Sequence, residues 1–133
     1  MPSNRAYALQ AERGSAVVEF ALLLPVLLLV TLAIVQVGIV ARDQLLVVEA
    51  ARAGAREAAV DPDAGTVRTS AIAAAPGIDP SRVEVSIQRS GGLGQPVSVK
   101  IGYAAPIAVP LAGWLFPSEV RLSATATMRQ EFG

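Results

Sequence analysis

Histidine and cysteine perform much of the nucleophilic, acid–base and zinc chemistry of proteins, and this sequence contains neither. Thiol nucleophiles, disulfides, Cys/His zinc sites and imidazole catalysis are therefore excluded. Asp61 and Asp63 flank a proline, and no third carboxylate follows at calcium-loop spacing, so we expect them to shape a turn. The glycine-rich residues 90–94, SGGLG, join two expected strands and lack the Lys-Ser/Thr of a phosphate loop. We predict no catalytic residue, no cofactor and no metal site, and hence not an enzyme.

Glu19 is the ionisable residue with the least usual setting, because it stands directly before a long apolar run. From Phe20 to Ala41 the chain has 22 residues without a formal charge, and about 20 apolar residues cross a bilayer core as a helix. A charge in such a helix costs on the order of 2.5–3.5 kcal/mol at the bilayer centre and less near its end. Ionisable residues kept at this cost usually have a function, so Glu19 is a candidate site residue.

The length of the run favours a membrane span over two alternatives. Buried core helices are usually shorter, and a cleaved secretory signal has an apolar stretch of about 7–15 residues that ends in a small-x-small site. Pro25 removes a helical hydrogen bond, which predicts either a mild kink or a bend that lets the helix pack into an assembly. Lys and Arg counts on the two sides are nearly equal, so the charge rule does not orient the span. We expect the larger domain after it to be extracytoplasmic.

The spacing GSAVVEF, from Gly14 to Phe20, resembles the processing site of type IV prepilins, in particular the G-x-x-x-x-E-[F/Y] pattern of the Flp/Tad subclass. The segment RGSAVVEFALLLPVLLLV, with EAARAGAREAAV downstream, is similar to TadE-like minor pilins, also called pseudopilins. The resemblance covers roughly residues 12 to 60. It implies a structural protein that acts in the assembly of a Flp/Tad-type pilus.

The resemblance also implies how the motif is used. A prepilin peptidase would cleave between Gly14 and Ser15, where glycine fits extended backbone with little strain. Glu19 would become the fifth residue of the mature chain, and its carboxylate would pair with the new amine of Ser15, in the same chain or in a neighbour. Glu19 and Pro25 are the expected docking residues for assembly. The implied partners are the peptidase, the major Flp-type pilin, a second pseudopilin and inner-membrane platform proteins.

The rest of the chain predicts an α+β domain. Residues 42–60 continue the first helix, with small residues on one stripe that pack against the chain's own sheet or against another pilin helix. A short helix from about Thr66 to Ala75 follows, stopped by Pro76 and Gly77. Period-two alternation then predicts three antiparallel strands, the first two joined by a turn in SGGLGQP. The inward residues are Val83, Val85, Ile87, Val97, Val99, Ile101, Tyr103, Leu122, Ala124, Ala126 and Met128.

Three segments follow from this pattern: a cytoplasmic leader over residues 1–14 that is cleaved, a transmembrane and continuing helix over 15–60, and a small extracytoplasmic domain over 61–133. The protein is expected in the inner membrane with a single pass and in contact with lipid. The sequence leaves open whether it then enters the pilus. Acidic and basic residues balance at 11 each, which predicts no nucleic-acid partner. The apolar loop around Trp114, Leu115 and Phe116 either packs under the sheet or forms a partner surface.

A second function remains open from the sequence. The chain could be a bitopic envelope protein whose small domain is permanently anchored and binds a ligand or partner. In that case the leader would stay attached, and replacing Glu19 by alanine would leave activity intact. An anchored enzyme is the third reading, and it lacks the histidine, cysteine or carboxylate cluster that such chemistry needs.

Overall fold

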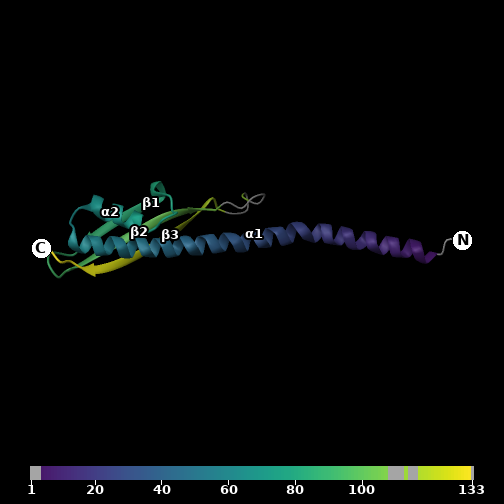
Figure 1. The fold of residues 1–133 in the computed structure, drawn as a ribbon, viewed down its shortest axis with the longest axis horizontal. Coiled ribbons are helices and arrows are strands. Elements are labelled where there is room, and N and C mark those ends of the chain that lie inside the picture. Colours follow the sequence, from purple (N-terminus) through teal and green to yellow (C-terminus); the bar gives the residue numbers. More distant parts are fainter. Residues whose placement is uncertain (1–3, 108–112, 114–116, 133) are drawn as a thin grey trace.

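The computed structural model describes residues 4–107, 113 and 117–132, with side chains from residue 15 onward. Its elements are α1 (Asn4–Val60), α2 (Ala64–Ala73), the 3-10 helix η1 (Pro80–Arg82), β1 (Val83–Arg89), β2 (Pro96–Pro106) and β3 (Glu119–Arg129). The C-terminal part of α1 lies against the sheet and α2, and the N-terminal part projects away from them (Figure 1). The predicted α+β fold, with a long apolar helix, a short helix and a three-stranded antiparallel sheet, is confirmed.

The sheet has the order β1-β2-β3, and both pairings are antiparallel. Val85 lies opposite Ile101, and Ile101 lies opposite Ala124, so one row of inward side chains crosses all three strands. Val97, Val99 and Ile101 of β2 are fully buried, whereas Lys100 between them is exposed. The alternation seen in the sequence therefore separates a covered face from a polar outer face.

Small residues on α1 bring the helix close to the sheet. Ala50, Ala51, Ala55, Ala58 and Ala59 are buried in the core, which confirms that this stripe packs against the chain's own domain. Gly54 lies at the closest approach: a β-carbon there would be 3.1 Å from Val99 Cγ1 and 3.3 Å from Ala71 Cβ. Because the side chains on this face are small, the backbone of α1 can pack closely against β2 and α2.

Aspartates cap both short helices: Asp63 is the N-cap of α2 and Asp79 is the N-cap of η1. Asp63 accepts hydrogen bonds from Thr66 N at 2.8 Å and Thr66 Oγ1 at 3.0 Å, and Asp61 Oδ1 accepts from Asp63 N at 2.8 Å. The expected turn-forming role of Asp61 and Asp63 is therefore confirmed. Since Asp63 is the N-cap, α2 begins at Ala64 and ends at Ala73, about two residues earlier at each end than the sequence pattern predicts.

Candidate membrane anchor and processing segment

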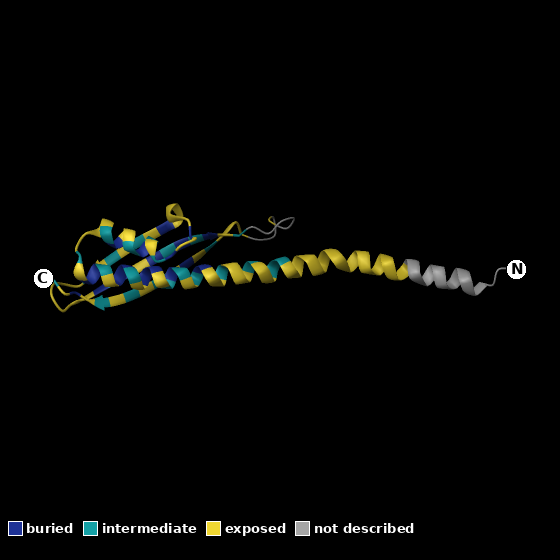
Figure 2. Ribbon diagram, viewed as in Figure 1, coloured by how far each residue is buried: buried dark blue, intermediate teal, exposed yellow. Residues whose placement is uncertain are grey.

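The N-terminal part of α1 carries large apolar side chains that the domain does not cover. Every residue from Ser15 to Thr31 is exposed, including Leu22 at 71% and Phe20 at 61% of their full accessible area. Figure 2 shows this stretch as a continuous exposed rod leading to the covered part of the helix. It is the one helix in the described chain that is long and apolar enough to cross a membrane. The 22 uncharged residues span about 33 Å at 1.5 Å per residue, close to the roughly 30 Å of a hydrocarbon core.

The motif residues lie near the start of that rod. The backbone of Gly14 is helical, within α1, and Ser15 and Glu19 lie one turn apart on the same helix face. Ser15 Oγ donates a hydrogen bond to Glu19 Oε1 at 3.4 Å. The carboxylate therefore reaches back to the residue whose amine a cut after Gly14 would release. Both residues and Phe20 are exposed, so the segment is accessible to a partner.

Pro25 lies inside α1, and the helix continues through it without a break. Nearby, Thr31 Oγ1 donates to the carbonyl of Leu27 at 2.8 Å, so the hydroxyl is satisfied within its own helix, as membrane helices require. Trp114, Leu115 and Phe116, expected in the core or at a partner surface, lie outside the described residues.

An apolar groove lies where the exposed rod meets the domain. It has a volume of about 480 Å³ and is lined by α1 on one side and by the ends of β2 and β3 on the other. The lining residues are Ala33, Gln36, Val37, Val40, Ala41, Gln44, Ile107, Val120 and Leu122. The groove therefore adjoins the last two turns of the uncharged run.

The uncharged run ends at an ion pair. Arg42 Nη1 is 3.7 Å from Asp43 Oδ1, and the Asp43 side chain is buried whereas the Arg42 side chain is largely exposed. Gly77 adopts a φ of +100°, and a β-carbon there would be 2.8 Å from Arg42 Nη2. The bare glycine backbone thus leaves room for the arginine beside the loop after α2.

The family model described as TadE-like protein matches residues 14–56. This segment is similar to the TadE-like family. The match begins at Gly14 and includes the motif, the exposed rod and most of the small-residue stripe, about a third of the chain. No curated protein matches this chain, and no solved structure does.

The similarity to the TadE-like family thus covers the exposed rod and the start of the packed part of α1. That family is structural rather than catalytic, and the long apolar helix indicates membrane anchoring. Among the residues that the structure describes, no group of three or more Asp, Glu, His or Cys could hold a metal ion. The family match and the exposed part of α1 coincide in the membrane anchor.

Arg89 is a structural residue that the sequence reasoning missed. Its guanidinium donates to the carbonyls of Ala58 at 2.6 Å and Asp61 at 3.1 Å, and to Gln130 Oε1 at 3.0 Å. Gln130 is buried, and its amide donates to the carbonyls of Gly91 and Gly92. The last turn of a helix leaves carbonyls without helical partners, so Arg89 closes the end of α1 from β1. Only the folded arrangement brings these segments together.

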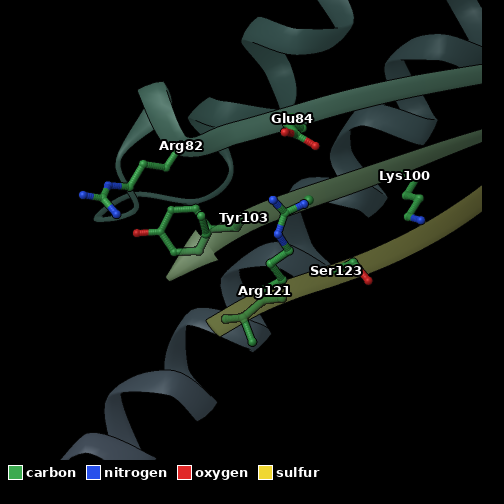
Figure 3. A pocket seen from close by; sticks show the side chains of 9 residues that line it. Arg82, Glu84, Lys100, Tyr103, Arg121 and Ser123 are labelled. Atoms are coloured by element: carbon green, nitrogen blue, oxygen red, sulfur yellow. The ribbon is translucent and has the colours of Figure 1, made fainter. Parts of the chain in front are cut away.

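The polar outer face of the sheet contains a shallow pocket of about 240 Å³. Arg82, Lys100 and Arg121 line it together with Glu84, and Gly102 contributes no side chain to its floor. Figure 3 shows these side chains arriving from the three neighbouring strands and η1. Three cations and one carboxylate give this surface a local positive charge.

Proposed function

We propose that the chain is a minor pilin of a Flp/Tad-type pilus, which a prepilin peptidase processes between Gly14 and Ser15 and which then acts in pilus assembly. The observation that carries the proposal is the coincidence of three features at one place. The TadE-like match begins at Gly14, the uncharged apolar run begins six residues later at Phe20, and Glu19 lies one helical turn from Ser15.

The geometry supports a role for Glu19 after cleavage. Removal of residues 1–14 would create an ammonium group on Ser15, at the N-terminus of the shortened helix. Because Glu19 reaches Ser15 within its own chain at 3.4 Å, the two charges would relieve part of each other's desolvation. The carboxylate would also interact favourably with the positive end of the helix dipole. A neighbouring chain that brought its own amine or carboxylate could exchange these pairings during assembly.

Gly14 supports the cleavage step in a different way. A glycine within a helix costs about 0.5–1 kcal/mol relative to alanine, so the helix is locally weak at the bond to be cut. We place the leader in the cytoplasm, the rod in the inner membrane and the domain outside it. The partners are the peptidase, the major pilin, a second pseudopilin and platform proteins of the inner membrane.

The test is the intact mass of the full chain, purified from cells with and without a prepilin peptidase. Cleavage of the major pilin in the same cells shows that the peptidase is active. We expect loss of residues 1–14 only when the peptidase is present. Gly14→Val should keep the leader. Its branched side chain would block a narrow subsite, and it restricts the backbone more than glycine does. Gly38→Val is the matched control: Gly38 lies in the same helix with open space around it, and this variant should be processed normally.

A leader that stays attached while the same peptidase processes the major pilin would overturn the proposal. The chain would then be a permanently anchored module. Glu19→Gln separates the two steps. It should be cleaved like the original chain but should cross-link less to the major pilin, because the neutral amide cannot form an ion pair with an ammonium group.

A further inference from the structure

The sheet reaches back along the apolar part of α1. Gln44 Nε2 donates to the carbonyl of Ser123 at 3.1 Å, and Glu131 N donates to the carbonyl of Ala59 at 2.8 Å. These two bonds fix β3 beside α1, running in the same direction. The start of β3 therefore lies beside helix residues that precede Gln44.

The depth of that start follows from standard rises. Val120 is three residues before Ser123, or about 10 Å at 3.3 Å per strand residue. The same distance along a helix is six to seven residues at about 1.5 Å each, which places Val120 level with about Val37. Ile107 lies about 7 Å farther out, level with about Ala33, because its amide donates to the carbonyl of Ser118 at 2.9 Å. The end of the domain thus overlaps the last two to three turns of the uncharged run.

This overlap has consequences for how α1 crosses a bilayer. If the helix moved outward until the whole domain cleared the hydrocarbon, a span of about 20 residues ending at residue 32 would begin at Arg13. Glu19 would then lie about 9 Å inside the hydrocarbon boundary, where a charge is costly. If Glu19 instead lies at the boundary of the hydrocarbon, a span of about 20 residues ends near Gly38, and Arg42 lies in the headgroup layer beyond it. The end of β2 and the start of β3 are level with this second boundary and must then lie within the interface.

The side chains at this end fit the second arrangement. The groove that faces α1 is lined by Ile107, Val120 and Leu122, whose apolar surface gains when it leaves water. Glu119 and Arg121 flank Val120 and are exposed on the outer side. They limit the depth to the headgroup layer, where the long arginine side chain can keep its charge among phosphates.

We propose that the β2–β3 end of the domain is seated in the membrane interface, with its apolar groove open to lipid acyl chains. The groove is lined by Ala33, Val37 and Ala41 of α1, and the exposed part of the same helix lies directly before them (Figure 2), so one lipid environment would cover both. On the outer face, Arg121 shares the positively charged pocket with Arg82 and Lys100, and the membrane end of this pocket, at Arg121 and Arg82, meets the anionic headgroups. The proposal rests on α1 spanning the membrane and does not depend on removal of the leader.

The absence of cysteine from the sequence makes a depth measurement direct. Single-cysteine variants of the full chain carry an environment-sensitive fluorophore in vesicles of phosphatidylethanolamine and phosphatidylglycerol, at low protein density. Doxyl groups on the acyl chains quench labels that they touch. Val120→Cys and Ser118→Cys report the proposed contact, and the second variant is an exposed position that leaves the groove packing unchanged.

Two positions serve as controls. Leu28→Cys lies in the exposed apolar rod and must be quenched if α1 is inserted. Thr125→Cys is exposed on the same strand, about 17 Å farther from the membrane than Val120, and should keep its fluorescence. We expect quenching at positions 118 and 120, greatest for doxyl groups near the headgroup.

Each other result overturns the proposal in a recognisable way. Quenching at Leu28 alone would place the domain clear of the bilayer. No quenching at any position would contradict the membrane span itself. Blue-shifted but unquenched labels at positions 118 and 120, with a shift that grows with protein density, would show a second apolar helix in the groove instead of lipid. Leader cleavage, read by mass, is unaffected by any of these results, so the two proposals fail separately.

Discussion

Replacing Arg89 by methionine should loosen the closure of α1 onto the sheet. The change keeps an unbranched side chain of similar length and removes the guanidinium. That group donates to the carbonyls of Ala58 and Asp61 and to the amide oxygen of Gln130, at 2.6, 3.1 and 3.0 Å. It also lies 5.2 Å from the centre of the Phe132 ring. Methionine cannot donate to any of these partners.

The magnitude follows from the number and setting of these bonds. A hydrogen bond to a charged group contributes about 1.5–3 kcal/mol, and a cation over an aromatic ring adds about 0.5–1 kcal/mol at an exposed site. The guanidinium is only partly buried, so water replaces some of what is lost. We expect the free energy of opening to fall by about 2–4 kcal/mol, less than the sum of the separate terms.

Hydrogen exchange of the β2 amides, measured on the full chain in detergent micelles, reports this loss of stability. Amides of the central strand β2 exchange when the domain opens, and each 1.4 kcal/mol is a tenfold change, so exchange should accelerate about 30-fold to about 1,000-fold. Arg56→Met is the matched control, since Arg56 is an exposed arginine near the same end of α1. If β2 exchanges at the original rate in Arg89→Met, or if Arg56→Met accelerates β2 exchange equally, the contacts of Arg89 do not hold α1 against the sheet.

Three further changes test other parts of the argument. Gly54→Val should destabilise the domain by about 1–3 kcal/mol through overpacking, because a β-carbon there is already 3.1 Å from Val99; unchanged β2 exchange would contradict this contact. Hydrogen bonds from the Thr66 amide, and then its hydroxyl, hold the pKa of Asp63 below its usual 3.8. The contribution of Asp63 to stability should be complete above pH 3.8 and lost as the pH falls through the lower pKa that Asp63 has in the folded chain. Acid unfolding followed by circular dichroism should show this loss in the original chain, and Asp63→Asn should lack it. Glu19→Gln should leave insertion of α1 in vesicles intact or improved, since a neutral amide costs less in lipid than a carboxylate; weaker insertion, measured by flotation, would argue against a boundary charge.

The local elements could be predicted because each leaves a pattern within a few residues. A long uncharged run and an alanine stripe predict α1, and period two predicts the strands and their inward faces. The hairpin turn also follows from its glycines, of which Gly94 has a φ of +76°. Helix ends were less accurate, because Asp63 was assigned to a turn although it also caps α2.

Contacts between distant segments could not be read from the sequence. Arg89 looks like one more polar residue at a strand end, and its role depends on where α1 ends relative to β1. The apolar groove depends on how far β3 is shifted along α1, which the bonds of Gln44 and Glu131 fix. The motif around Gly14 and Glu19 could be proposed as a site because all of its residues are local.

The exposed rod places a constraint on any assembly route. Fifteen large apolar side chains between Val17 and Ile39 are exposed on the isolated chain. At about 1.5 kcal/mol or more for each side chain moved into an apolar environment, water contact along the whole rod would cost on the order of 20 kcal/mol. That exceeds the roughly 5–15 kcal/mol by which a typical domain is stable. A chain that enters a fibre must therefore exchange lipid directly for the helices of other subunits.

The same constraint gives the charge at Glu19 a specific purpose in the proposed function. Packing of apolar helices against one another is close to neutral relative to lipid, because both surroundings are apolar. The exchange then lacks a strong hydrophobic driving force, and the apolar rod alone does not set which subunits meet or in which register. A carboxylate at one fixed position along the helix, paired with an amine of a neighbouring subunit, would set both the partner and the register. This is why we expect Glu19→Gln to affect cross-linking to the major pilin and not the anchoring of the chain.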